Sequence, residues 1–197
     1  MHLVKNLLVD TDILEVCSLV SVLAQDLEDD DLDQPDNKGR SLLTYAVEAG
    51  DRALALTRML VNLGADPEAS FAWYLRSQMS KSELEDDLDE DTLYVLSTAV
   101  MEKAGGGQGL KAMVDRTMVA LGTSKQVHGP LFRKIRGLLA HNWLRPPQLR
   151  SLAVKSLRRS LGPKRLSKGH AVMSRLKVPR KLQRFITLEE KIPTQLL

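Results

Sequence analysis

The sequence predicts an all-α protein, and three observations support this class. Apolar residues recur at spacings of three and four over most of the chain, as they do on one face of an amphipathic helix. No stretch alternates convincingly between apolar and polar residues, which is the pattern of a half-buried strand. Turns rich in glycine and proline separate the helical stretches. With 197 residues, the chain has room for one domain or two small ones.

The periodic stretches place the helices along the chain. The expected helices span residues 12–25, 42–47, 54–63, 92–104, 110–121, 131–142 and 148–161, and a further helix starts at 71–76. Gly64 suits the left-handed position just past a helix end, and Pro67 cannot continue the helix before it. Residues 83–91 are strongly acidic and are expected to form a solvated linker or the exposed first turn of the next helix.

The two halves of the chain carry opposite charge. Residues 1–100 hold 7 Lys/Arg and 21 Asp/Glu, a net of −14, whereas residues 101–197 hold 21 and 4, a net of +17. Such asymmetry indicates two modules with different partners, or attraction between the halves themselves.

Composition also bears on the compartment. The single cysteine, Cys17, cannot form an internal disulfide, so a reducing compartment is expected: the cytoplasm, with the nucleus as a second location. Charges at Lys5, Asp10 and Glu15 interrupt the leading apolar stretch, which argues against a transmembrane helix and a signal peptide.

The sequence gives no sign of a catalytic or metal site. The four histidines have no close pairing with one another or with Cys17, so no zinc site and no cofactor are expected. The glycine-rich stretch 105–109 continues as Leu110-Lys111-Ala112 and lacks the hydroxyl residue of a phosphate-binding loop. No nucleophile and base are suitably spaced, and the protein is expected to be non-enzymatic.

Residues 12–76 resemble ankyrin repeats, whose 33-residue unit follows a pattern of Asp, Gly, Leu, Ala and Gly and closes on Gly-Ala-Asp. The matching residues, in order, are Asp36, Gly39, Leu43, Ala46, Gly50 and Gly64-Ala65-Asp66. Ser41, Leu42 and Thr44 stand where Thr, Pro and His are usual. The resemblance implies a short helical solenoid that binds a target protein, at residues it does not identify, with degenerate flanking helices completing a stack over residues 1–121.

Residues 146–186 resemble a SOCS box. Its elongin-binding helix has Leu, then Cys four residues later, then an aliphatic residue after another four; Leu149 and Leu157 fit, and Ala153 replaces the Cys. Further on, a Leu-x-Val-Pro segment followed by an aliphatic and an aromatic residue is similar to the cullin-contacting part, with Lys177 in place of the first Pro.

The two resemblances together imply an all-α protein with an ankyrin-like solenoid, a connecting helix and hinge at 122–145, and a three-helix SOCS-box-like module at 146–190. The implied role is a non-catalytic adaptor of an elongin B/C–cullin–RING ubiquitin ligase. The implied elongin C contacts are Leu149, Leu152, Ala153 and Leu157. The implied cullin contacts are Leu176, Val178, Pro179, Leu182 and Phe185.

Two alternatives stay open at the level of sequence. The apolar face of helix 148–161 could pack on the protein's own core instead of on a partner. The basic half could also contact phosphate, making the chain a scaffold or a nucleic-acid-associated protein. That half holds only three of the chain's aromatic residues, Phe132, Trp143 and Phe185, which disfavours base stacking.

Overall fold

The computed structural model describes residues 13–23, 32–81, 88–121, 130–144, 149–162 and 178–189, together with the single residues 166, 172 and 175. Regular structure in these ranges is entirely helical, which confirms the all-α prediction for them. The α-helices are α2 (Ile13–Leu23), α3 (Leu42–Glu48), α4 (Leu54–Leu63), α5 (Pro67–Lys81), α6 (Glu90–Lys103), α7 (Gly107–Leu121), α8 (Pro130–Leu144), α9 (Leu149–Leu161) and α12 (Arg180–Ile186), and the 3-10 helix η2 spans Gly50–Ala53.

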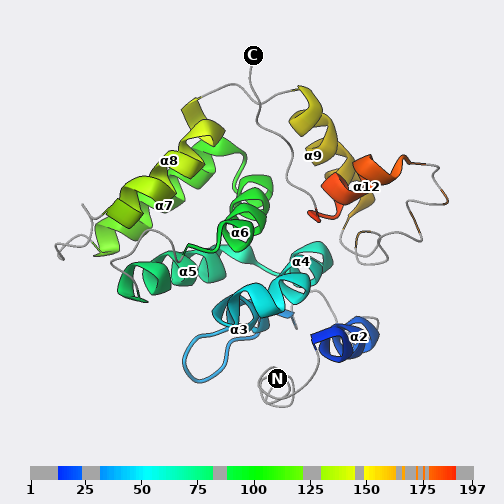
Figure 1. The fold of residues 1–197 in the computed structure, drawn as a ribbon, viewed down its shortest axis with the longest axis horizontal. Coiled ribbons are helices and arrows are strands. Elements are labelled where there is room, and N and C mark those ends of the chain that lie inside the picture. Colours follow the sequence, from blue (N-terminus) through cyan, green and yellow to red (C-terminus); the bar gives the residue numbers. More distant parts are fainter. Residues whose placement is uncertain are drawn as a thin grey trace.

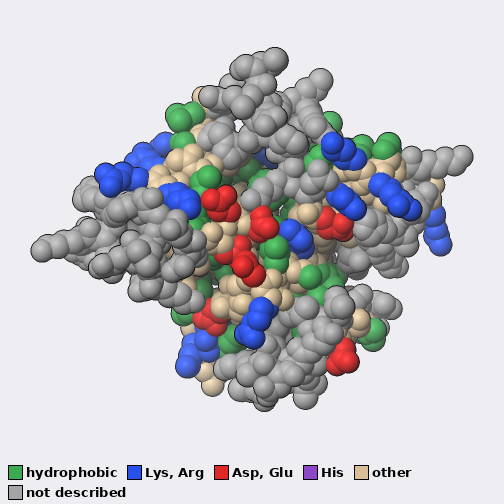
Figure 2. Space-filling model, in the orientation of Figure 1, with side chains coloured by type: hydrophobic (Ala, Val, Ile, Leu, Met, Phe, Trp, Pro, Cys, Tyr) green, Lys and Arg blue, Asp and Glu red, His purple; other side chains and the backbone are tan. Residues whose placement is uncertain are grey.

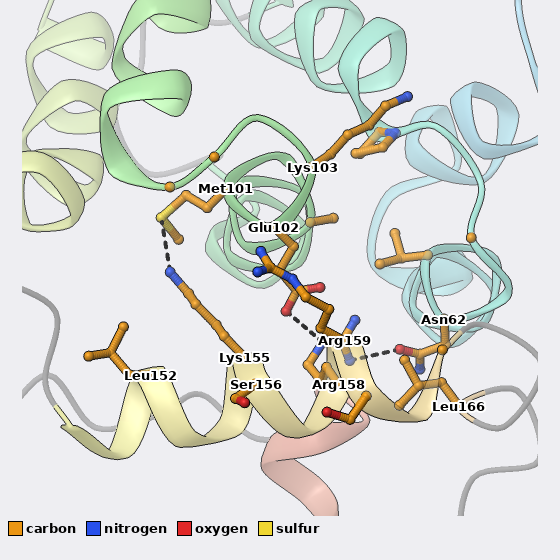
Figure 3. Close-up of a pocket in the computed structure, with 18 of the residues that line it drawn as sticks. Asn62, Met101, Glu102, Lys103, Leu152, Lys155, Ser156, Arg158, Arg159 and Leu166 are labelled. Carbon is orange, nitrogen blue, oxygen red and sulfur yellow. Dashed lines mark hydrogen bonds and ion pairs between the residues drawn. The ribbon is translucent and has the colours of Figure 1, made fainter.

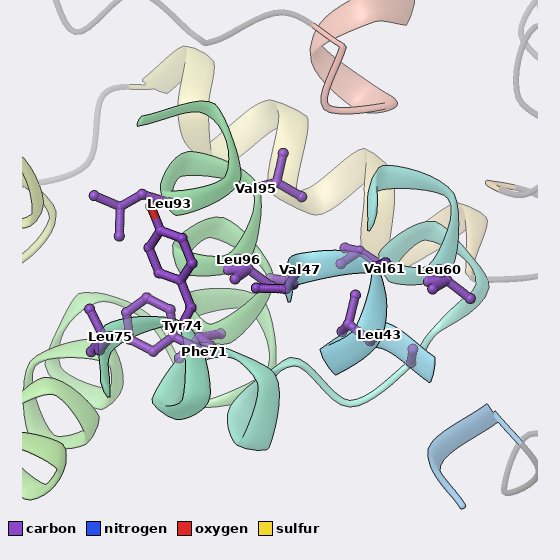
Figure 4. Packing of buried hydrophobic residues seen from close by; sticks show 14 of the residues in the cluster. Leu43, Val47, Leu60, Val61, Phe71, Tyr74, Leu75, Leu93, Val95 and Leu96 are labelled. Atoms are coloured by element: carbon purple, nitrogen blue, oxygen red, sulfur yellow. The ribbon is translucent and has the colours of Figure 1, made fainter. Parts of the chain in front are cut away.

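The helices form two rows that share one core. In one row, α5 packs between α3 and α7; in the other, α4 packs between α2 and α6. The rows are joined because α3 contacts α4 and α5 contacts α6, and α8 lies against α7 at the end of the stack (Figure 1). Residues from α2 to α8 contribute to this larger core, in which Leu43, Phe71 and Leu96 lie together and are almost fully buried (Figure 4).

Polar side chains also link neighbouring parts of the stack. Ser41 caps α3 by accepting a hydrogen bond from the backbone N–H of Thr44 at 3.3 Å, and the Thr44 hydroxyl lies 2.9 Å from that of Ser70 in α5. In addition, the backbone N–H of Asp66 donates to the Asp33 carboxylate at 2.7 Å. Asp33 and Asp66 are 33 residues apart, so the segments before α3 and before α5 contact each other directly.

Several helices begin earlier than the sequence predicted, α5 and α6 among them. Pro67 opens α5 four residues before the predicted start, because proline at a first helical position loses no hydrogen bond and has the right φ. In α6, Asp89 caps the helix and Glu90 and Asp91 form its first turn, where acidic side chains are favourable. This matches the second of the two readings of the acidic stretch for residues 88–91, while residues 82–87 lie outside the described ranges.

A second, smaller core joins α9 to α12. Val154 of α9 packs with Phe185 and Ile186 of α12 and with the single residue Leu166. Two residues past α12, Leu188 leaves this module and is buried in the larger core. Apart from residues 166, 172 and 175, the middle of the predicted three-helix module lies outside the described part of the chain.

The predicted connecting segment 122–145 contains a well-packed helix. Ile135 and Leu139 of α8 are buried in the larger core, so α8 is a member of the stack. None of the helices in the described ranges has both the length and the apolar character needed to cross a bilayer.

Candidate functional site

The two faces of α9 have different environments. On the inner face, Val154 and Arg158 are only 2% and 3% exposed. On the outer face, Leu152 and Leu157 are 46% and 40% exposed, and the Ala153 side chain is exposed beside them. Residues three and four positions apart lie on the same side of a helix. Val154 and Arg158 therefore share the buried inner face of α9, while apolar residues at similar spacing lie on its outer face.

Arg158 fixes the inner face of α9 to three other helices. Its Nε donates to the Glu102 carboxylate of α6 at 2.7 Å, and its Nη1 donates to the Asn62 side-chain oxygen of α4 at 3.0 Å and to the carbonyl of Ile186 at the end of α12. Asn62 in turn donates to the carbonyl of Thr187 at 3.2 Å. The buried guanidinium is therefore paired and hydrogen-bonded, as a desolvated charge must be.

The predicted elongin C contacts lie on the outer face of α9 wherever the structure describes them. Leu152, Ala153 and Leu157 are exposed. Leu149 is the first residue of α9, but its side chain lies outside the described part. Leu152, Ala153 and Leu157 thus lie outside both cores, whereas Val154 of the same helix packs in the small core.

The predicted cullin contacts are split between surface and interior. Pro179, which precedes α12, is exposed, and Val178 and Leu182 are half-buried against the small core. Leu176 lies outside the described residues. Phe185 is fully buried with Val154 and Ile186, so a direct surface contact by Phe185 does not agree with this structure. An aromatic ring is the largest apolar group on α12, and burying it against α9 is what joins the two helices.

A cleft of about 1020 Å³ lies between α9 and the ends of α4 and α6 (Figure 3). We call it the inter-module cleft; α9 lines one wall with Leu152, Lys155 and Arg159, and the opposite wall includes Val61 and Met101. Sequence analysis did not find this cleft because its walls come from distant segments: Asn62 and Arg158 are 96 residues apart. The one sequence signal for Arg158 was its position: in the SOCS-box-like pattern, Arg commonly follows the last aliphatic residue, which is Leu157 here.

The charges of the described residues are unevenly distributed on one face of the molecule. Figure 2 shows Asp and Glu side chains gathered near the middle of this face and Lys and Arg side chains toward its two sides. Among the described residues, no three His, Cys, Asp or Glu side chains are grouped so that they could hold a metal ion.

Two potentially reactive side chains are in environments that favour their neutral forms. Burial raises the pKa of the half-buried Cys17 thiol, which disfavours the thiolate. Burial, followed by the nearby charge of Asp89, raises the pKa of Tyr74 far above its ordinary value, and the Tyr74 hydroxyl donates to the carbonyl of Asp89 at 2.6 Å. Both groups are better explained as structural than as nucleophilic.

No family model matches the chain, and comparison with curated proteins and with solved structures also gave no match.

Proposed function

We propose that the protein is a non-catalytic substrate-recognition adaptor of an elongin B/C–cullin–RING ubiquitin ligase. The outer face of α9 would bind elongin C, with elongin B attached to it, while the helical stack holds a target protein in the cytoplasm or nucleus. Bringing a target lysine close to a ubiquitin-charged enzyme raises its effective concentration, so the adaptor needs no catalytic residue of its own.

The outer face of α9 is the observation that carries this proposal. The SOCS-box-like spacing selects Ala153 and Leu157, and these are exposed, whereas Val154 and Arg158 between and beside them hold the helix to the rest of the molecule. A helix that is fixed on one side and apolar on the other is suited to a groove in a partner. Full burial of one leucine in such a groove contributes about 1.5–3 kcal/mol.

Features of the stack support the ankyrin-like part of the proposal. The ankyrin repeat is about 33 residues long, and the hydrogen-bonded turn residues Asp33 and Asp66 are separated by 33 positions. Gly39 and Gly64 have φ values of 74° and 100°, a conformation that glycine adopts without strain, at the two turn positions that the ankyrin pattern reserves for glycine.

For the cullin, the proposal uses the part of the 178–189 segment that can be reached. Val178, Pro179 and Leu182 offer partly exposed apolar surface, and Phe185 supports them from the interior. Cullin recruitment therefore depends on these surface residues. Phe185 contributes indirectly, because its burial holds α12 against α9.

The proposal is tested by co-purification of the full chain with the elongin B/C complex. Leu157→Asp should abolish capture, because a carboxylate would be desolvated in the groove. Leu144→Asp is the matched control: Leu144 is also an exposed leucine, 73% accessible, but it is the last residue of α8 and not part of α9. Capture that survives Leu157→Asp, or that both variants lose equally, would contradict the adaptor function.

A gain-of-binding variant keeps this test independent of folding. Ala153→Cys adds one sulfur atom at an exposed position, so the protein's own cores are untouched. Filling the partner's pocket with this atom should increase affinity by roughly 1 kcal/mol, or about fivefold, measured as the dissociation constant for elongin B/C. Unchanged or weaker binding would show that Ala153 does not occupy the position of the family's cysteine.

A further inference from the structure

The inter-module cleft contains positive charge that no described residue neutralises by an ion pair. Of the basic side chains that line it, Arg158 pairs with Glu102 at 2.7 Å, and Lys103 pairs with Asp66 at 2.7 Å. Lys155 and Arg159 form no ion pair with any residue that the structure describes. Two cations of α9 are therefore available to a ligand in the cleft.

Lys155 is the more buried of these two cations. Its Nζ points across the cleft and lies 3.8 Å from the sulfur of Met101, which is a weak acceptor (Figure 3). Desolvation lowers the pKa of Lys155, and the charge of Glu102 only partly opposes this effect. An anion next to Nζ would stabilise the charged ammonium form and so offset the effect of desolvation on the pKa of Lys155.

The other walls of the cleft indicate what carries that anion. Apolar side chains line much of the cleft, including Val61, Met101 and Leu152, so a ligand that combines carboxylates with apolar groups is complementary to it. The volume of about 1020 Å³ is at the upper limit for a small-molecule pocket and leaves room for a short stretch of peptide.

Nucleic acid fits the same cleft poorly. None of the described residues that line it is aromatic, so these walls offer bases nothing on which to stack.

We propose that the inter-module cleft binds an acidic peptide segment of a partner protein, with one peptide carboxylate on Lys155, a second on Arg159 at the rim, and apolar peptide side chains against Met101 and Leu152. This site is centred on Lys155, which faces the stack, whereas Leu157 of the proposed elongin C contact lies on the outer face of α9; Leu152 belongs to both sites. Binding of a peptide through Lys155 and Arg159 does not depend on the adaptor function.

The test is fluorescence anisotropy with the full chain and a labelled peptide in which pairs of Glu alternate with single Leu residues. Lys155→Met keeps the apolar stem but removes the charge, and it should raise the dissociation constant at least about tenfold, the effect of losing one partly desolvated charge pair. Lys155→Arg, which keeps the charge, should restore most of the affinity. Lys111→Met is the matched control, because Lys111 pairs with Asp115 on α7 and is not among the cleft residues; it should change the constant less than about twofold.

Two further probes separate this proposal from its rivals. The same peptide with Gln in place of Glu should bind at least about tenfold more weakly, and a single-stranded oligothymidine should not compete at about 0.15 M salt. No binding of the acidic peptide, equal binding by Lys155→Met, or equal binding of the Gln peptide would overturn the proposal. Tighter binding of the oligonucleotide would overturn it in favour of a nucleic-acid surface.

Discussion

Asp36 organises the turn before α3 with both of its carboxylate oxygens. Oδ1 accepts hydrogen bonds from the backbone N–H groups of Lys38 and Arg40 at 2.8 and 2.9 Å, while Oδ2 accepts from the Tyr45 hydroxyl and pairs with the Arg40 guanidinium. The bond from Tyr45, followed by the backbone bond from Arg40, holds the pKa of Asp36 well below its ordinary value. The turn is therefore built around a carboxylate that stays ionised.

Asp36→Asn should lower the melting temperature at pH 7, and the loss should shrink in acid. The unfolded chain binds a proton at about the ordinary pKa of 3.8, whereas the folded chain does so only at lower pH. Between these two values the unfolded state holds more protons, so the stabilisation by Asp36 is complete above the unfolded pKa and is lost as the pH falls through the folded one.

Thermal melts from pH 7 to pH 3 measure this difference between the unmodified chain and Asp36→Asn. Asp115→Asn, which removes a carboxylate from a more exposed ion pair on α7, is the control and should have the smaller effect at pH 7. A gap between Asp36→Asn and the unmodified chain that stays constant down to pH 3 would show that the ionised state of Asp36 is irrelevant to the turn.

At this scale the sequence predicted some residue positions well and others poorly. The exposure of Ala153 and Leu157 could be anticipated because it follows from local helical spacing. The burial of Phe185 and the pairing of Arg158 with Glu102 could not, since both depend on which distant helices meet. Long-range contacts between side chains leave no periodic trace in a single sequence.

Among the helices, the start of α7 shows why glycine positions were the hardest to interpret. The sequence predicted a break over residues 105–109, but α7 begins at Gly107. A Cβ at Gly107 would lie 1.9 Å from the carbonyl oxygen of Asn142, near the end of α8. Gly107 is thus required by the close approach of two helices, and a run of glycines does not distinguish this need from a flexible loop. By contrast, α4 matched its predicted range, because Gly64 ends it with a left-handed residue.

Gly107→Ala and Gly137→Ala should change stability in opposite directions. Gly107→Ala forces α7 away from the backbone of α8 and should lower the free energy of unfolding by about 1–3 kcal/mol, as overpacking does. Gly137 is an exposed residue within α8, and its added Cβ would meet nothing within 4 Å. Gly137→Ala should therefore raise the free energy of unfolding by about 0.5–1 kcal/mol.

Urea denaturation measures both glycine variants on the same scale. Helix propensity favours Ala at Gly137, inside α8, whereas at Gly107, the first residue of α7, the contact with Asn142 opposes it. If Gly107→Ala were as stable as Gly137→Ala, α7 and α8 would not approach each other as closely as the structure has them.

On the scale of the whole molecule, the residues that the structure describes form a large core and a small one that meet across polar contacts. The stack supplies Asn62 and Glu102, and the α9–α12 module supplies Arg158, with Leu188 as an apolar link into the larger core. The opposite charges of the two sequence halves anticipated attraction between them, and the Lys103–Asp66 and Lys134–Glu90 pairs are two such contacts. Charge alone could not predict that α8, which belongs to the basic half, packs in the stack.

The location of α8 predicts where the chain can be shortened. A chain that ends after Leu144 loses the small core, but of the larger core it loses only Leu188 among the described residues. It should unfold in one cooperative transition at a reduced melting temperature. A chain that ends after Leu121 also loses Ile135 and Leu139 of α8, and with them about 3–6 kcal/mol of apolar burial at about 1.5–3 kcal/mol for each side chain. This loss is comparable with the whole stability of a small domain, so the shorter chain should melt without cooperativity or not fold. Circular dichroism melts of the two truncated chains measure the difference, and equal, cooperative melts would show that the stack is already complete at α7.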